Sequence, residues 1–171
     1  MGRLALAAVI GLIGAGIVHI IAVLATPRLS DNNAFARFGG EVGRFEPVES
    51  NDPLARAVAC RFDLARPVRL LAEGDVPFWS ASLLAPDGTN IYSLNDRTAE
   101  DAALDLIVVR RSEVEALREQ LVEDPPEIVA LPFDSAMVVL RALVPDETYG
   151  ALAGAFLGEA SCDPLAATAE G

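Results

Sequence analysis

The N-terminal segment of the chain is a long apolar run without a formal charge. Between Arg3 and Arg28 the sequence contains no Asp, Glu, Lys or Arg, and the run from Leu4 to Ala25 includes one ionisable residue, His19. A helix over Leu4–Ala25 would extend about 33 Å at ~1.5 Å per residue, which matches a hydrocarbon core of roughly 30 Å. The run predicts one transmembrane helix, with residues 1–27 as an anchor.

A cleaved signal peptide is the competing interpretation of the same run. Arg3 supplies a charged start, and Val23-Leu24-Ala25 resembles a small-residue cleavage site. The apolar core of a signal peptide usually spans about 7 to 15 residues, which is shorter than this run. We therefore expect the segment to remain as an anchor.

The cysteines indicate the orientation of this anchor, because arginines flank the run on both sides and their count is nearly even. Only Cys60 and Cys162 occur, and both follow the apolar run. An even pair without other metal ligands predicts one disulfide, which needs an oxidising compartment such as the periplasm; two unrelated buried thiols are the alternative. The bridge predicts a bacterial inner-membrane protein with a cytoplasmic N-terminus and a periplasmic main domain.

Small residues form one face of the predicted membrane helix. Ala7, Gly11 and Ala15 are spaced four apart, which would let a partner helix or a second copy of this chain approach closely, although glycine and alanine are common in membrane helices generally. His19 extends this face, and in the membrane an ionisable group needs a hydrogen-bond partner. We expect an interhelical hydrogen bond, because a single histidine cannot supply both axial ligands of a haem.

Charge and composition exclude several classes of function. The formal net charge is −12 at pH 7, so direct nucleic-acid binding is not expected. All 13 basic residues are arginine, which excludes Schiff-base chemistry and phosphate loops that need lysine. The sole histidine, His19, lies in the apolar run, so the rest of the chain lacks an imidazole for a catalytic triad. No cofactor and no metal site are expected.

The residues after the anchor predict one domain. A juxtamembrane helix near Asp31–Phe38 and a linker rich in glycine are expected over residues 28–50. The folded domain is expected over 51–164 and a flexible tail over 165–171. Asp52 followed by Pro53 predicts a short helix ending near Ala59.

Runs of β-branched and aromatic residues separated by turn signals predict six strands: Pro67–Ala72, Phe78–Ala85, Asn90–Asn95, Leu104–Val109, Glu127–Leu131 and Ala136–Val144. Pro86-Asp87-Gly88 predicts a hairpin turn. Apolar spacing predicts helices over 112–121, with a capping box of Ser112 and Glu115, and over 146–157. The fold class is therefore α+β: a mainly antiparallel sheet with two or three short flanking helices, preceded by the membrane helix.

Five residues form a candidate ligand region. Asp87 and Asp96 flank a strand of the predicted hairpin and could pair as hydrolytic carboxylates, or they could cap turns. Trp79 could line an apolar pocket or lie in the core. Arg141 interrupts an apolar strand and could pair with a buried acid or bind an anion. The fifth residue, Asn90, lies in the turn beside Asp87.

The sequence resembles an uncharacterised family of small proteobacterial, especially alphaproteobacterial, inner-membrane proteins that is classed with the domain of unknown function numbered twelve fifty-four. The resemblance rests on these blocks: Gly14-Ala15-Gly16-Ile17-Val18-His19-Ile20, Cys60-Arg61-Phe62-Asp63-Leu64, Gly74-Asp75-Val76-Pro77-Phe78-Trp79-Ser80, Asn90-Ile91-Tyr92-Ser93-Leu94-Asn95-Asp96-Arg97 and Ala160-Ser161-Cys162. It implies a single N-terminal anchor and a periplasmic domain. It supplies no catalytic residues.

Two functions follow as hypotheses. The first is a non-enzymatic accessory or interaction subunit that binds a membrane or periplasmic protein or a second copy of itself. The second is a membrane-anchored ligand-binding or carbohydrate-processing domain. An exposed apolar patch on the helix that carries Gly150, Gly154 and Gly158 would favour the first; a deep pocket holding Trp79, Asp87 and Asp96 would favour the second.

Overall fold

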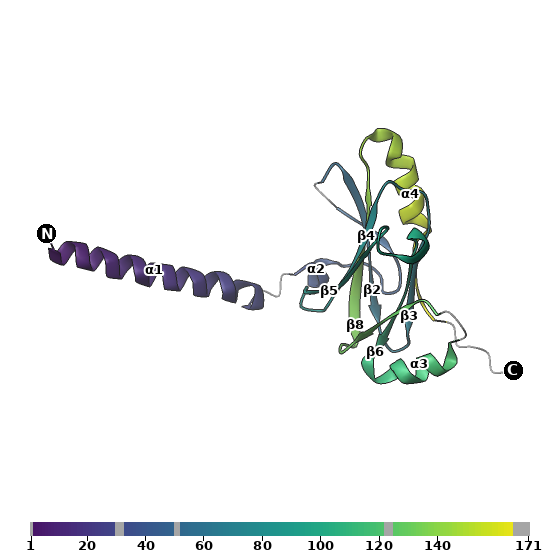
Figure 1. Cartoon of the computed structure of the whole chain (residues 1–171), viewed down its shortest axis with the longest axis horizontal. Helices are drawn as coiled ribbons and strands as arrows, with labels where there is room; N and C mark the ends of the chain where they lie inside the picture. Colours follow the sequence, from purple (N-terminus) through teal and green to yellow (C-terminus); the bar gives the residue numbers. More distant parts are fainter. Residues whose placement is uncertain (1, 30–32, 50–51, 122–124, 166–171) are drawn as a thin grey trace. The chain divides into compact units, whose positions relative to one another are not determined.

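The computed structural model describes residues 2–29, 33–49, 52–121 and 125–165. The chain divides into two compact units between Asn33 and Ala34 (Figure 1). The first unit contains helix α1 (Gly2–Leu29), and the second unit contains all the strands.

Helix α1 exposes its large apolar side chains from Leu4 to Leu24. It is the one helix in the described part of the chain that is long and apolar enough to cross a membrane, a property that signal sequences share. A Cβ atom built at Gly11, Gly14 or Gly16 would meet no atom within 4 Å. The small-residue face and the orientation of the helix stay predictions.

The second unit contains two sheets. The first, here called sheet A, has five strands in the order β1 (Glu46–Val48), β2 (Ala55–Asp63), β8 (Ser135–Leu143), β4 (Trp79–Leu84) and β5 (Asn90–Asn95). The second, sheet B, has four strands in the order β7 (Glu127–Leu131), β6 (Leu104–Arg110), β3 (Val68–Ala72) and β9 (Ser161–Pro164).

All neighbouring strands are antiparallel except β6 and β7. Parallel neighbours need a crossover connection. Helix α3 (Val114–Gln120) supplies it and covers the outer face of sheet B, where Val114 and Leu117 pack with Ile107 and Val109.

Short helical segments complete the second unit: α2 (Ala34–Arg37), α4 (Gly150–Glu159) and the 3₁₀ turns η1 (Glu100–Ala102), η2 (Arg111–Glu113) and η3 (Glu147–Tyr149). Helices α3 and α4 lie at opposite ends of this unit (Figure 1). Asp146 caps η3, because its carboxylate accepts a hydrogen bond from the backbone amide of Thr148.

The main core contains the inward side chains of both sheets together with Ala153, Phe156 and Leu157 of α4. Trp79 is 1% exposed, and its ring centroid lies 6.2 Å from that of Phe156. The indole nitrogen donates a hydrogen bond of 2.8 Å to the carbonyl of Ala102, which satisfies the polar atom of this buried ring.

A disulfide joins the two sheets inside this core. Cys60 lies in β2 of sheet A and Cys162 in β9 of sheet B; their exposed fractions are 0% and 2%, and their Cα atoms are 6.6 Å apart. The predicted bridge is therefore confirmed. The cysteines are separated by 102 residues, so the bond closes most of the domain into one covalent loop.

The expected elements agree with the structure for the six predicted strands and for the helices α3 and α4. The helix expected over Asp52–Ala59 is wrong, because these residues lead into strand β2. The amide of Leu54 donates to the carboxylate of Asp52, which forms a turn. From Val58 onward, alternate residues face the core, as in a strand with one buried face.

Two further expectations differ from the structure. The β residues form two sheets instead of one, because β1, β2 and β9 add strands that the sequence did not indicate. The segment expected as a linker belongs to the second unit, which begins at Ala34 instead of Asn51. Asp31, Asn51 and the last six residues of the predicted tail lie outside the described residues.

The expected capping box at Ser112 and Glu115 does not form. Val114 begins α3 after the 3₁₀ turn η2, and the position before it makes no side-chain capping bond. Glu113 instead forms an ion pair with Arg110 at the end of β6.

Removal of the bridge is expected to destabilise the domain. In the chain-entropy model a loop of about 100 residues contributes about 4 to 5 kcal/mol, and strain or residual unfolded structure lowers this value. Cys60→Ser, Cys162→Ser and the double variant should all unfold at a lower temperature than the oxidised wild type, and a reductant should lower the Tm of the wild type only. Equal Tm values for the oxidised wild type and the double variant would contradict a stabilising bridge.

Candidate functional site

The outer face of sheet A is the surface on which the candidate site is built. Strand β8 is the central strand of this sheet, and its Met137, Val139 and Arg141 alternate with residues that face the core. Ala59 of β2 pairs with Val139, which extends the apolar surface across the sheet. This face is therefore apolar at its centre and ends in a guanidinium.

The segment around α2 covers part of this face. Phe35 and Phe38 pack against the buried cluster of Ala59, Met137 and Val139. A one-turn helix has little intrinsic stability in water, so these tertiary contacts hold it in place. Segment 34–38, called the α2 cover below, is thus part of the domain surface.

Arg61 of β2 holds the α2 cover by two contacts. Its guanidinium carbon lies 4.7 Å from the ring centroid of Phe35, within the range of a cation–π interaction. One of its terminal nitrogens donates a hydrogen bond of 3.2 Å to the carbonyl of Phe38. These contacts fix both aromatic residues of the cover.

A cavity of about 690 Å³ lies between the α2 cover and sheet A. Its apolar lining comes from Phe38, Val48, Ala59, Leu84, Met137 and Val139, and its charged lining from Arg37, Glu46, Glu49 and Arg141. Small-molecule sites usually occupy about 300 to 1,000 Å³ and combine apolar walls with few polar groups. The cavity has the size and chemistry of such a site.

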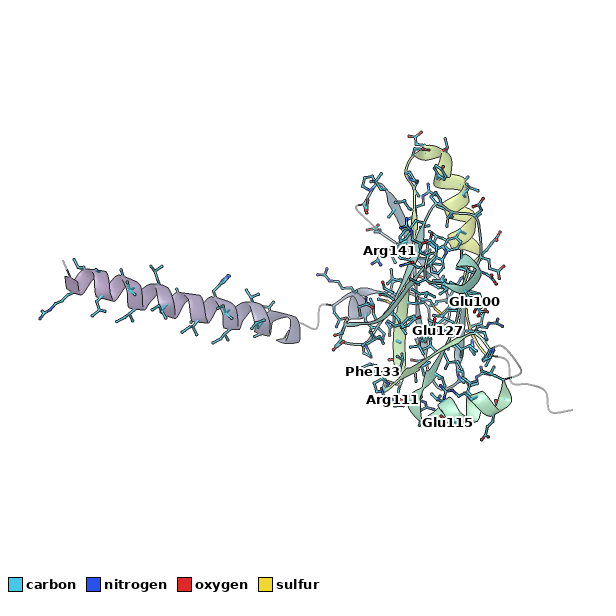
Figure 2. The ribbon with its side chains drawn as sticks, viewed as in Figure 1. Glu100, Arg111, Glu115, Glu127, Phe133 and Arg141 are labelled. Carbon is cyan, nitrogen blue, oxygen red and sulfur yellow. A yellow bond between two sulfur atoms is a disulfide. The ribbon has the colours of Figure 1, made fainter. Side chains whose placement is uncertain are left out.

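Arg141 of β8, labelled in Figure 2, and Glu46 of β1 are the charged side chains of the strands of sheet A that line this cavity. The neighbours of Arg141 across the strands are Ala57 and Ser80, whose small side chains leave the guanidinium uncovered. Within the described ranges, Arg141 makes no hydrogen bond and no ion pair. The sequence left two roles open for this arginine, and the described residues do not pair it with a buried acid.

A second cavity, of about 620 Å³, lies where β5 of sheet A approaches β7 of sheet B. Arg69 forms two hydrogen bonds with the carboxylate of Asp105, at 2.8 and 2.7 Å. The remaining charged lining is acidic: Glu73, Glu100, Asp101 and Glu127. Among the described residues, no group of three His, Cys, Asp or Glu side chains is arranged to hold a metal ion.

Tyr92 and Glu127 connect the two sheets beside this acidic cavity. Burial raises the pKa of the Tyr92 hydroxyl well above its ordinary value, and the hydrogen bond to the Glu127 carboxylate raises it further. The hydroxyl therefore stays protonated and donates. This contact lies on β5 and β7, whereas the disulfide joins β2 to β9.

The residues of the predicted ligand region are dispersed. Trp79 lies in the core. Asp87 lies in the turn between β4 and β5, where the Thr89 amide donates to its carboxylate and lowers its pKa. The amide of Asp96 donates to the carbonyl of Trp79 at the other end of this hairpin. Because β5 separates the two carboxylates, they do not form a hydrolytic pair.

The remaining two residues of that region are also apart. The side-chain amide of Asn90 donates a hydrogen bond to the hydroxyl of Ser93, so it supports the hairpin. Arg141 is the one predicted residue that lines the cavity on sheet A. Phe38, Met137 and Val139 were missed, because residues 135–143 form a nearly continuous apolar run in which no alternation marks the outward-facing set.

Helix α4 presents a different surface. Gly150 and Gly154 face Arg56, whose guanidinium donates a hydrogen bond of 2.8 Å to the carbonyl of Gly150. A Cβ at Gly150 would lie 3.1 Å from this guanidinium, which explains the need for a small residue. The exposed positions of α4 before Glu159 carry no polar side chain: Ala151, Leu152, Gly154, Ala155 and Gly158.

Comparison with known proteins gives the fold and no family. No family model matches the chain, and no curated protein matches its sequence. The VPA0106 protein from Vibrio parahaemolyticus has a similar structure, with a TM-score of 0.62 and 12% identity over 77% of this chain and 32% of that one. An uncharacterized protein from Burkholderia cenocepacia gives a TM-score of 0.48 and 13% identity over 66% of this chain and 34% of that one.

The chain thus spans about a third of the length of each solved structure. At 12% identity, the Vibrio structure supports the arrangement of the strands and assigns no activity to this chain.

Arg61→Gln is expected to loosen the α2 cover. It removes a cation–π contact and a hydrogen bond, together worth about 1 to 2 kcal/mol, so local opening should become roughly 5- to 30-fold more frequent. The Phe38 amide, which donates to the carbonyl of Ala34, should exchange its hydrogen faster by that factor. Arg66→Gln, on the turn after β2, is the matched control. Equal exchange in both variants would show that Arg61 does not hold the cover.

Tyr92→Phe is expected to flatten the alkaline limb of the stability profile. Because the pKa of Tyr92 is higher in the folded than in the unfolded state, its protonated hydroxyl stabilises the fold fully below about pH 10. This contribution declines above pH 10, where the tyrosine of the unfolded chain ionises first, and is lost beyond the folded-state pKa. Between about pH 8 and about pH 11, the Tm should fall more steeply with rising pH in the wild type than in the variant. Tyr149→Phe, which removes the other tyrosine hydroxyl, is the control. Identical slopes for wild type and Tyr92→Phe would refute the assignment.

Proposed function

We propose that this chain is a single-pass bacterial inner-membrane protein whose outer domain is a non-enzymatic interaction subunit in the periplasm. Helix α1 is the anchor in this proposal, with its N-terminus in the cytoplasm. The apolar length of α1 and the disulfide between the sheets support this placement, because such a bridge persists in an oxidising compartment. The resemblance to the inner-membrane family numbered twelve fifty-four agrees with it and stays a prediction.

The exposed face of α4 is the observation that carries the interaction role. A surface helix of a soluble domain normally places polar residues on its solvent side. From Gly150 to Gly158 this helix has no polar side chain, and Leu152 is 47% exposed. A protein partner that covers this face would remove the apolar surface from water.

The small residues of this face indicate the kind of partner. A Cβ atom built at Gly158 would meet no atom of the described chain within 4 Å, and Gly154 borders a groove of about 450 Å³ between α4 and strands β1 and β2. Small residues let a second helix or strand approach the backbone closely, so the proposed partner presents an apolar segment to α4. The partner is a membrane or periplasmic protein, or a second copy of this chain.

A membrane-anchored ligand-binding domain is the second candidate. The cavity on sheet A supports it, because that cavity combines apolar walls with the uncovered guanidinium of Arg141. The two candidates use different elements, and the groove beside α4 and the cavity on sheet A share Pro47 and Val48 of β1. Substitutions on α4 and at Arg141, which the two do not share, test them separately.

Affinity purification of the full-length chain tests the interaction role. A tagged chain should be recovered from membranes in mild detergent with a stoichiometric partner, counted by mass spectrometry against an unrelated single-pass anchor. Ala155→Arg places a charge on the exposed face of α4 and is expected to remove the partner. Ala116→Arg makes the same change on the exposed face of α3 and is expected to retain it.

Two results would contradict this proposal. The first is recovery, with the tagged wild-type chain, of neither another protein above background nor a differently tagged second copy of this chain. The second is equal loss of the partner in both arginine variants, which would mean that α4 is not the surface that binds it.

A further inference from the structure

We propose that the cavity on the outer face of sheet A binds an anionic single-chain amphiphile, with its carboxylate or phosphate on Arg141 and its apolar tail along Phe38, Val48 and Leu84. This inference does not depend on partner binding by α4. It assigns a ligand class to the outer face of sheet A, whose cavity shares Pro47 and Val48 with the groove beside α4.

The walls of the cavity favour an apolar tail. Met137 and Val139 project from the central strand, and Phe38 of the α2 cover packs over them. Leu84 at the end of β4 continues the same surface, because it pairs with Met137. Met137 and Val139 are only 2% and 7% exposed under this cover, so a hydrocarbon chain placed here would contact the half-buried Phe38, Val48 and Leu84.

The charge at the end of this apolar surface favours an anion. Arg141 lies next to Val139 on the outward side of β8, two residues further along the strand. Its cross-strand neighbours Ala57 and Ser80 carry no charge, and the described chain gives it no ion-pair partner. A guanidinium donates paired hydrogen bonds to carboxylates and phosphates, so an external anion could accept hydrogen bonds from Arg141 and balance its charge.

Two acids, Glu46 and Glu49, line the cavity, and neither forms an ion pair with Arg141 within the described residues. Glu46 lies on β1, two strands from β8, or about 10 Å at the usual strand spacing. It pairs with Ala59, which in turn pairs with Val139, so it also lies in a different row from Arg141. One oxygen of its carboxylate accepts a hydrogen bond from the Glu41 amide at 3.0 Å, which directs Glu46 toward its own loop.

Apolar walls and an unpaired cation together select the ligand. A neutral alcohol would satisfy the walls and leave the guanidinium without an anion. Inorganic phosphate would satisfy the guanidinium and make no contact with the apolar lining. A fatty-acid carboxylate or an alkyl phosphate satisfies both, and the two arms of the test below separate these headgroups.

Photo-crosslinking of the full chain in phosphatidylcholine nanodiscs tests this proposal. The probe is a twelve-carbon fatty acid that carries a diazirine in its tail, and crosslinked peptides are mapped by mass spectrometry. Unlabelled laurate or dodecyl phosphate should suppress labelling of peptides that contain residues 34–49 or 135–143. Dodecanol and inorganic phosphate should compete poorly. Stronger competition by one of the two anions identifies the preferred headgroup.

Variants of the guanidinium provide the decisive comparison. Arg141→Gln should reduce the labelling that unlabelled laurate suppresses by about tenfold, which corresponds to the loss of one charge-assisted hydrogen-bonded pair. Arg141→Lys should retain part of it, and Arg66→Gln should behave as the wild type. Thermal unfolding of each variant should match the wild type, because Arg141 is exposed and supports no internal contact within the described chain.

Three outcomes would overturn the proposal. In the first, laurate and dodecyl phosphate do not suppress labelling of the cavity peptides of the wild type. In the second, the labelling that they suppress is as strong in Arg141→Gln as in the wild type. In the third, dodecanol suppresses labelling as strongly as laurate does. Competition by inorganic phosphate as strong as that by dodecyl phosphate would also overturn it, because the tail would then contribute nothing.

Discussion

The packing of two sheets against each other is the constraint on which the outer domain depends. Sheet A and sheet B bury one common core, and the Cys60–Cys162 bridge crosses that core between β2 and β9. Each of these strands alternates between the core and the outside, so a one-residue slip would withdraw its cysteine from the core. The bridge therefore fixes the register of both strands as well as the contact between the sheets.

Because the inner faces are occupied by the core, the outer faces and the ends of the two sheets remain for function. Helix α3 closes the outer face of sheet B with apolar contacts. The α2 cover closes sheet A only in part, and a cavity lies beside it with a guanidinium that the described chain leaves unpaired. Helix α4 buries Ala153, Phe156 and Leu157 and leaves Ala151, Leu152 and Ala155 exposed. The described domain thus combines a closed interior with two distinct surfaces that lack an internal partner.

The sequence predicted the local elements well where residue pattern and burial agree. The run over Asn90–Asn95 became β5 and the run over Glu127–Leu131 became β7, because β-branched and aromatic residues between turn signals leave few alternatives. Asp52-Pro53 led to the wrong prediction of a helix, because a turn before a strand can use the same residues as the start of a helix. Strands β1 and β9 are short and were missed, because their pairing with β2 and β3 decides their conformation and local propensity does not.

The sequence by itself determined the apolar helix, the α+β class and the pairing of its only two cysteines. It also excluded any mechanism that needs a lysine, because the chain has none. These follow from composition and periodicity, which do not depend on long-range contacts. Only the tertiary structure decided which candidate residues meet. It separates Asp87 from Asp96 along one strand and places Arg141 beside Phe38, about a hundred residues earlier in the chain. Such contacts depend on strand order and register, and neither is encoded in the local pattern of a single strand.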